Sequence, residues 1–309
     1  MPPRLGFVTA ALLAAAGLLA TACSAGNDAG SSGDGVITAV GAENQYANVI
    51  GQVGGRYVNV RAIESNPNTD PHTFEASPSV AQEVSKAQLV VQNGIGYDTY
   101  MNRIEAAAPS SARKVIVAAN LLGLPDSTPN PHLWYRPNTM PAVAKAVAKD
   151  LSALDPAHAK YFAANAEKFD ASLQPWYQAI ARFKAAYPNT PVAVTEPVGD
   201  YMLQAAGTRI LTPYTLQAEI MNGVDPSPQD VSLQNSFFTG HKVKVFVYNQ
   251  QVTDSLTESF LNLAHKEGIP VVGVYETMPT PGYDYQSWML AEVKALQKAV
   301  TDKTSTVKL

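Results

Sequence analysis

Short runs of β-branched and other apolar residues recur along this chain, and stretches with helical spacing separate most of them. The runs cover residues 36–40, 58–63, 89–92, 114–118, 191–195, 243–248 and 271–274. Their length and continuous apolar character are typical of parallel strands buried on both faces. Helices are predicted at 77–86, where Pro78 takes the first helical position, and at 140–154. This alternation predicts an α/β architecture.

The middle of the chain has a different pattern, because a long helix without a strand is predicted from Asp155 to Tyr187. Its apolar stripe consists of Phe162, Phe169, Leu173, Trp176, Ile180, Phe183 and Tyr187. A helix of this length spans roughly 45–50 Å. Pro175 should kink it or loosen one turn, and Pro188 should end it.

We therefore expect two α/β lobes, each a mostly parallel sheet flanked by helices, joined by one long rigid helix. The expected boundaries are 36–154 for the first lobe, 155–188 for the connecting helix and 189–309 for the second lobe. A ligand site is expected between the lobes, at the carboxyl ends of the strands, where open α/β sheets bind their ligands.

The first 22 residues have the pattern of a secretory signal peptide: Arg4, an apolar stretch at 5–20 and small residues before Cys23. Cys23 is the only cysteine of the chain, and its position predicts lipidation. Two or more acyl chains on this residue would hold the protein durably on a membrane. Residues 24–35 are small and polar, so 23–35 is interpreted as a lipidated flexible tether.

The charge balance argues against nucleic acid as a partner. The chain carries a formal net charge of −4, which becomes −5 when Arg4 leaves with the signal peptide. The sequence shows no basic cluster of the kind that binds phosphate backbones.

Two of the five histidines lie in similar surroundings. His72 and His132 each follow a strand and a turn-rich loop, each is preceded by proline, and each has an aromatic residue two positions later. Imidazole is the commonest metal ligand in proteins, and it binds through a neutral nitrogen. The paired Pro-His loops therefore predict two metal ligands in one cleft. The remaining three histidines, His158, His241 and His265, are expected to be solvated.

Carboxylates from the second half of the chain are expected to complete the site. Glu196 ends a predicted strand before a short helix, and Asp284 precedes the last helix. A helix-capping role for Asp284 is nearly as good an interpretation, and Glu276, after the strand at 271–274, is a weaker candidate for the same place. Two neutral imidazoles and two carboxylates would give a shell of charge −2, which neutralises a divalent cation.

These residues, in this order, resemble the metal-binding (zinc/manganese) solute-binding lipoproteins of ABC transporters, the adhesin-type group. The resemblance covers nearly all of the chain after the tether. Its segments are residues 42–46 with 54–55, 70–75, 93–97, 131–134, 155–158, 195–196 and 282–289.

The resemblance implies metal bound between two lobes by His72, His132, Glu196 and Asp284, with Tyr283 and Glu276 as alternatives for the last ligand. It also implies an extracytoplasmic, lipid-anchored monomer that is not an enzyme and that delivers its metal to an ABC transporter membrane permease.

The cognate metal stays open between zinc and manganese. Zinc-specific members of this family often have histidine at the third ligand position and a histidine-rich loop before the second ligand. Glu196 and the histidine-free segment 121–130 favour manganese, whereas intrinsic affinity favours zinc.

Two alternatives belong to other functional classes. A secreted metal-dependent hydrolase would need an open coordination position and a general base, but the sequence has no His-Glu-x-x-His helix. A surface adhesion lipoprotein without a ligand would leave the paired Pro-His loops unexplained.

Overall fold

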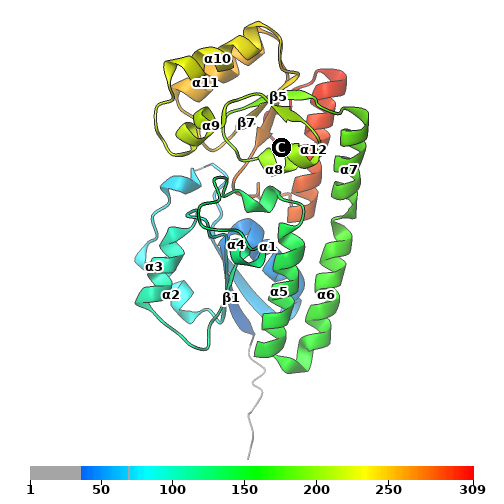
Figure 1. Ribbon diagram of the computed structural model, residues 1–309. Coiled ribbons are helices and arrows are strands. Elements are labelled where there is room, and N and C mark those ends of the chain that lie inside the picture. Colours follow the sequence, from blue (N-terminus) through cyan, green and yellow to red (C-terminus); the bar gives the residue numbers. More distant parts are fainter. Residues whose placement is uncertain (1–35, 69) are drawn as a thin grey trace, which may run out of the picture. The chain divides into compact units, whose positions relative to one another are not determined.

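The structure is a computed structural model that describes residues 36–68 and 70–309 (Figure 1). The predicted signal peptide, the tether and Cys23 lie outside the described residues. All described residues belong to one compact unit. In this part of the chain, no helix has the length and apolar character needed to cross a membrane.

The first sheet contains four parallel strands in the order β2-β1-β3-β4. Its strands are β1 (Ile37–Glu43), β2 (Val58–Glu64), β3 (Leu89–Gln92) and β4 (Lys114–Val117). The accompanying helices are α1 (Asn44–Gly54), α2 (Pro78–Lys86), α3 (Thr99–Ala107), α4 (Ala118–Leu121) and α5 (Thr139–Leu154). From β1 the chain connects to β2 on one side and, later, to β3 and β4 on the other side. α/β sheets open a crevice for ligands at such a point, here between β1 and β3.

The second sheet is also parallel and has the equivalent order, β6-β5-β7-β8. Its strands are β5 (Pro191–Val194), β6 (Arg209–Ile210), β7 (Val245–Asn249) and β8 (Val271–Val274). Its helices are α8 (Asp200–Ala205), α9 (Tyr214–Met221), α10 (Pro228–Thr239), α11 (Ser255–Lys266) and α12 (Tyr285–Asp302). The strand β6 was not predicted, because two residues are too short to form a recognisable apolar run. The fold class expected from the sequence is confirmed.

The expected connecting helix consists of two consecutive helices rather than one. After a 3₁₀ turn at Pro156–His158 come α6 (Ala159–Ser172) and α7 (Gln174–Ala186). The interruption lies at Leu173, whose N–H donates to the carbonyl of Asp170, three residues back. Pro175, two residues later, lacks an N–H and its ring crowds the preceding turn, which explains why the helix is interrupted here.

The apolar stripe of this segment is buried as predicted. Six of its seven residues are buried, and Tyr187 packs partly buried against them. Figure 1 shows α6 beside α5 and α7 beside α12, so the two helices pack against helices of different sheets. The main core cluster accordingly includes residues of both sheets, such as Val49 of α1, Trp176 of α7 and Trp288 of α12. This shared core ties the two sheets together.

A buried carboxyl group lies within this shared core. Glu292 of α12 accepts hydrogen bonds from Nε1 of Trp288 at 2.9 Å and from the hydroxyl of Tyr135 at 3.1 Å. Burial raises the pKa of Glu292 to about 8, against the opposing effect of the two hydrogen bonds. Glu292 is therefore protonated in the folded protein at neutral pH.

We predict that Glu292 makes the protein less stable as the pH rises. An unfolded glutamate titrates near about 4.3. Between these two pKa values the folded protein holds a proton on Glu292 that the unfolded chain has lost. This contribution to stability is fully present below the unfolded-state pKa, and it is lost progressively as the pH rises through the folded-state pKa of about 8. Glu292→Gln places a neutral isostere at this position and removes the titration. Between pH 5 and 7, the unfolding free energy of the variant should therefore fall with pH less steeply than that of the wild type, and the two slopes should differ by about 1.4 kcal/mol per pH unit.

Chemical denaturation of the metal-free protein across this pH range measures the effect. The matched control is Glu258→Gln, because Glu258 is exposed on α11. Equal pH slopes for the wild type and Glu292→Gln would contradict the assignment.

Candidate metal centre

His72 is presented by a short 3₁₀ turn, Pro71–Thr73, that follows β2. The Oδ1 atom of Asp70 accepts the backbone N–H of His72 at 2.8 Å, which fixes the start of the turn. The ring of Phe74 lies 4.8 Å from that of Tyr100 of α3, measured between centroids, and holds the other end. The aromatic residue two positions after His72 thus helps to hold this loop.

His132 lies in the loop after β4 and is completely buried. The Oδ1 atom of Asn130 lies 3.0 Å from the backbone nitrogen of His132 and 2.9 Å from its Nδ1. A side-chain carbonyl can only accept, so Nδ1 carries the proton and Nε2 keeps its lone pair. Burial lowers the pKa of His132, which keeps the ring neutral. Nε2 is therefore a ready metal ligand.

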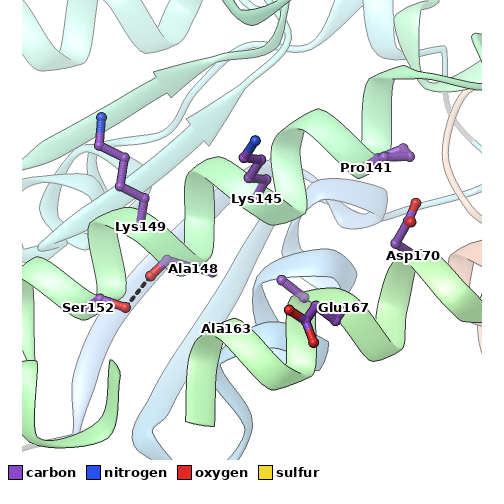
Figure 2. A pocket seen from close by; sticks show the side chains of 9 residues that line it. Pro141, Lys145, Ala148, Lys149, Ser152, Ala163, Glu167 and Asp170 are labelled. Atoms are coloured by element: carbon purple, nitrogen blue, oxygen red, sulfur yellow. Dashed lines mark hydrogen bonds between the residues drawn. The ribbon is translucent and has the colours of Figure 1, made fainter. Parts of the chain in front are cut away.

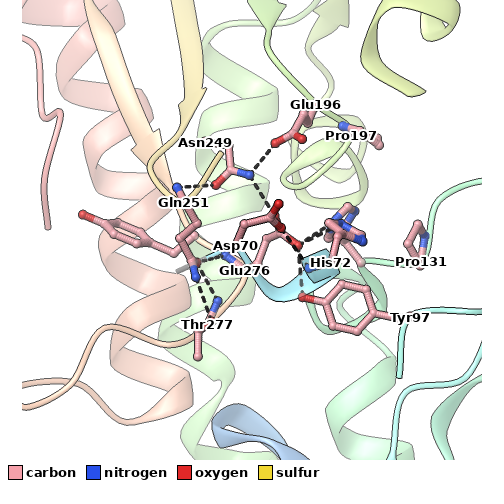
Figure 3. Close-up of polar contacts among 12 residues, drawn as sticks. Asp70, His72, Tyr97, Pro131, Glu196, Pro197, Asn249, Gln251, Glu276 and Thr277 are labelled. Carbon is pink, nitrogen blue, oxygen red and sulfur yellow. Dashed lines mark hydrogen bonds and ion pairs between the residues drawn. The ribbon is translucent and has the colours of Figure 1, made fainter. Parts of the chain in front are cut away.

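Glu276 lies against both candidate histidines, and Figure 3 shows it beside His72. It follows β8, and its Oε2 lies 3.1 Å from Nε2 of His72 and 3.2 Å from Nε2 of His132. Two atoms bound to one zinc at about 2.0–2.2 Å would be separated by roughly 3.0–3.5 Å. The three ligand atoms all lie within 4.8 Å of one another. Their spacing therefore fits a common metal ion.

The electrostatics of these three residues also favour a cation. Burial opposes ionisation of Glu276, but the adjacent imidazoles outweigh burial and lower its pKa. Burial alone would lower the pKa of His72, yet the charge and contact of Glu276 raise it to about 9. The lone pair of Nε2 in His132 faces the same carboxylate oxygen. A positive charge between them, as a proton or a metal ion, removes their repulsion.

Glu196 is brought to the same region from the loop after β5, and its side chain is nearly fully buried. Its Oε2 accepts a hydrogen bond from the side-chain amide of Asn249. Among the described residues, Oε1 has no hydrogen-bond partner. Burial and the nearby charge of Glu276 raise the pKa of Glu196. An unpaired buried oxygen costs about 1–3 kcal/mol, which a bound cation would offset.

The structure does not bring Asp284 into this cluster. Asp284 is the N-cap of α12: its Oδ1 accepts the backbone N–H of Ser287 at 2.9 Å, and the hydroxyl of Ser287 accepts the backbone N–H of Asp284. This reciprocal capping box occupies the carboxylate. Tyr283, the other alternative, packs partly buried against the core. Glu276, the weaker candidate from the sequence, takes the place expected for Asp284.

The Glu276 loop is held by side chains that were not singled out as functional from the sequence. Asn44, at the start of α1, makes two hydrogen bonds to the backbone of Met278, at 2.8 and 2.9 Å. Gln45 donates to the carbonyl of Glu276 at 3.1 Å. From the other side, Oε1 of Gln251 accepts the backbone N–H groups of Glu276 and Thr277 at 2.6 and 2.8 Å. The loop is therefore fixed by elements of both sheets.

Tyr97 and Asn249 contact the cluster directly and were not predicted as part of the site. The hydroxyl of Tyr97 donates to Oε2 of Glu276 at 3.0 Å. Asn249 donates to Oε1 of Glu276 at 2.8 Å and also to Glu196. In the sequence, Tyr97 is marked only by belonging to residues 93–97, one of the segments that resemble the family. Asn249 ends a strand, and nothing in its sequence context marks it.

Three further carboxyl groups lie at the carboxyl ends of the first sheet. Glu43 and Glu64 are register partners on β1 and β2, and Asp98 accepts backbone hydrogen bonds from Asn93 and Gly94. Burial is the main cause that raises the pKa of all three, to about 8 for Glu64 and about 6 for Asp98. At neutral pH, Glu64 is therefore mostly protonated and adds little negative charge behind the cluster, and burial favours the neutral form of Glu43 as well.

The other histidines lie outside the cluster. His241 and His265 are exposed, as expected. His158 is only partly exposed, because its ring stacks on Tyr57 with centroids 3.7 Å apart and its Nδ1 lies 2.6 Å from Asp155. The expectation that His158 is solvated was therefore wrong.

A known protein family matches most of this chain. The family model of the periplasmic zinc-uptake complex component A (ZnuA) matches residues 40–299. This chain belongs to the ZnuA family. The match covers both sheets and all four residues that surround the candidate site.

Curated relatives of this ZnuA-family chain match over a shorter part. The manganese-binding lipoprotein MntA of Bacillus subtilis is 27% identical over 178 residues, which is 55% of this chain and 56% of MntA. The manganese ABC transporter substrate-binding lipoprotein PsaA of Streptococcus pneumoniae is 25% identical over 236 residues, 70% of this chain and 71% of PsaA. The chain spans little more than half the length of the first relatives it matches.

Solved structures share the fold. The periplasmic zinc-binding protein TroA of Treponema pallidum superimposes with a TM-score of 0.69 at 17% identity, covering 84% of this chain and 99% of TroA. A manganese-bound periplasmic metal-binding protein of Candidatus Liberibacter asiaticus gives the same TM-score at 17% identity, with 85% and 99% coverage.

A surface groove of about 470 Å³ between α5 and α6 is separate from this cluster (Figure 2). Lys145, Lys149, Glu167 and Asp170 surround its alanine-rich floor. None of the candidate ligands lines it, so it does not contribute to the metal centre.

We predict that His72→Ala and His132→Ala each weaken zinc binding by more than about 100-fold, because even residues that only orient a ligand contribute about 10–100-fold. His241→Ala removes an exposed histidine and should leave affinity unchanged. Competition titration with a chelator measures all three variants. Equal losses in the three would remove the two loops from the site.

A second comparison separates the two acidic candidates. Glu276→Ala should abolish most of the metal affinity, because it removes the oxygen that faces both imidazoles. Asp284→Ala should leave affinity intact and lower the unfolding free energy by about 1 kcal/mol, the usual loss for an N-cap. Calorimetric titration and thermal denaturation give both quantities. Loss of affinity in Asp284→Ala would restore Asp284 as a ligand.

Proposed function

We propose that this ZnuA-family chain captures a divalent transition metal, zinc or manganese, outside the cytoplasm and delivers it to the membrane permease of an ABC importer. One observation carries the proposal: Nε2 atoms of two histidines from the first sheet lie 3.1 and 3.2 Å from one carboxylate oxygen of the second. The proposed ligands are His72, His132, Glu196 and Glu276.

The chemistry of this ligand set suits a divalent ion. Two neutral imidazoles and two carboxylates carry a combined charge of −2, which cancels the charge of the cargo in a site where an uncompensated charge would be costly. His132 and Glu276 are completely buried, and the side chain of His72 is 20% exposed. Imidazole nitrogen suits zinc, and carboxylate oxygen suits both zinc and manganese, whereas magnesium and calcium prefer oxygen alone.

The names of relatives support the same cargo and partner. Relatives are described as manganese-binding lipoproteins and as metal ABC transporter substrate-binding lipoproteins. We extend these descriptions to this chain. We also propose, from its sequence, an anchor through lipidated Cys23, a tether 23–35 after a signal peptide 1–22, and a monomeric state. We also propose that 36–154 and 189–309 act as two lobes joined by 155–188.

Capture is favoured over metal-dependent hydrolysis by the surroundings of the cluster. Three of the four proposed ligands are buried, and hydrogen bonds from Tyr97 and Asn249 surround the carboxylates. Catalytic zinc sites instead keep a coordination position open to water and substrate. The arrangement therefore favours a carrier that is not an enzyme.

We predict that one zinc or manganese ion binds per chain and stabilises the fold. A ligand of the folded state at 100 times its Kd raises the unfolding free energy by about 2.7 kcal/mol. The test is a metal titration of the protein without residues 1–23, with thermal denaturation at each concentration and the His72→Ala/His132→Ala double variant as the control. An unchanged melting temperature with both metals would refute metal capture, and metal-dependent hydrolysis of ester or peptide substrates would favour the enzyme alternative.

A further inference from the structure

Asn249 lies at a position from which it reaches both acidic ligands. It is the last residue of β7, which runs between β5 and β8, and it is completely buried. Glu196 follows β5, and Glu276 follows β8. Figure 3 shows the Asn249 side chain between the two carboxylates.

The orientation of the Asn249 amide is fixed by its other contacts. Its Oδ1 accepts the backbone N–H of Gln251 at 3.0 Å, so the NH₂ group faces the opposite way. The backbone N–H of Asn249 donates to Oγ1 of Thr195 at 3.0 Å, which holds the strand end next to Glu196. The NH₂ group has two hydrogens. It donates to Oε2 of Glu196 and, at 2.8 Å, to Oε1 of Glu276.

These two hydrogen bonds leave one oxygen on each carboxylate that Asn249 does not contact; on Glu276 this oxygen, Oε2, also accepts a hydrogen bond from the hydroxyl of Tyr97 at 3.0 Å. Oε2 of Glu276 faces the Nε2 atoms of His72 and His132. Oε1 of Glu196 is buried and has no hydrogen-bond partner among the described residues. With the other oxygen of each carboxylate engaged by the amide, the four proposed ligands would supply two nitrogen and two oxygen donors. Turning either carboxylate to present both oxygens to the metal would distort its hydrogen bond to Asn249, so the amide opposes that rotation.

We propose that Asn249 is a positioning residue that holds both carboxylates in one-oxygen coordination and thereby sets the metal preference toward zinc. Zinc is satisfied by four ligands in a tetrahedral arrangement. Manganese favours an octahedral, oxygen-rich shell, which two carboxylates approach when each supplies both oxygens. This inference rests on the proposed function. It reverses the preference for manganese that the count of acidic ligands suggests.

The test compares zinc and manganese affinities in the wild type, Asn249→Ala and Asn249→Ser, with Asn262→Ala as the control because Asn262 is exposed on α11. Chelator competition gives both Kd values, and X-ray absorption at the zinc edge gives the number of coordinating atoms. Residues that orient a metal ligand contribute about 10–100-fold to affinity. We expect Asn249→Ala to lower zinc affinity by this factor and manganese affinity by at least tenfold less.

The coordination number distinguishes positioning from a general structural role. Wild-type protein should show four nitrogen or oxygen neighbours at zinc, and Asn249→Ala should show five or six as a carboxylate turns. Asn249→Ser retains one donor, so its ratio of affinities should be intermediate; it also serves if Asn249→Ala does not fold.

The affinities and the coordination number together test the role of Asn249 separately from metal capture. Equal losses for both metals, or an unchanged coordination number in folded variants, would overturn the inference while leaving metal capture intact. Wild-type protein that binds neither metal would overturn the proposed function and this inference with it.

Discussion

The carboxylate of Glu276, which follows a strand of the second sheet, contacts the two histidines that come from loops of the first sheet. One of its oxygens faces an imidazole from each of the two Pro-His loops, at 3.1 and 3.2 Å, and the other accepts a hydrogen bond from Asn249. An anion with no exposure to water requires compensation on all sides. The hydroxyl of Tyr97, the amide of Asn249 and the ring of His72 provide it. The geometry of the metal centre, and the fixed position of the loop after β8, both follow from this requirement.

The equivalent strand order of the two sheets gives each one the same means of orienting its ligands. Asn93 directly follows β3, the third strand of the first sheet, and its side chain donates to the carbonyl of Pro131 at 2.8 Å, next to His132. Asn249 ends β7, the third strand of the second sheet, and orients Glu196 and Glu276. Both asparagines lie beside the crevice where the strand order reverses. One asparagine thus holds the backbone next to His132, and the other holds the two carboxylates.

The linking segment and the shared core restrict how such a site can exchange its cargo. Two consecutive helices, α6 and α7, pack on different sheets, and one apolar cluster includes residues of both. Wide separation of the sheets would expose this cluster to water, at about 25 cal/mol per Å² of apolar surface. Local movement of a ligand loop costs far less. Among the four proposed ligands, His72 is the most exposed.

The sequence by itself determined the α/β alternation, the buried stripe of the linking segment and the candidate ligands His72, His132 and Glu196, because these depend on local spacing and on proline, histidine and strand-end patterns. Only the tertiary structure decided which acidic residue meets the histidines. Asp284 and Glu276 both occupy loops before the last helix, and the choice depends on which carboxylate caps α12 and which one points across to the first sheet. The role of Asn249 likewise depends on three neighbouring strands, whose order no local pattern encodes.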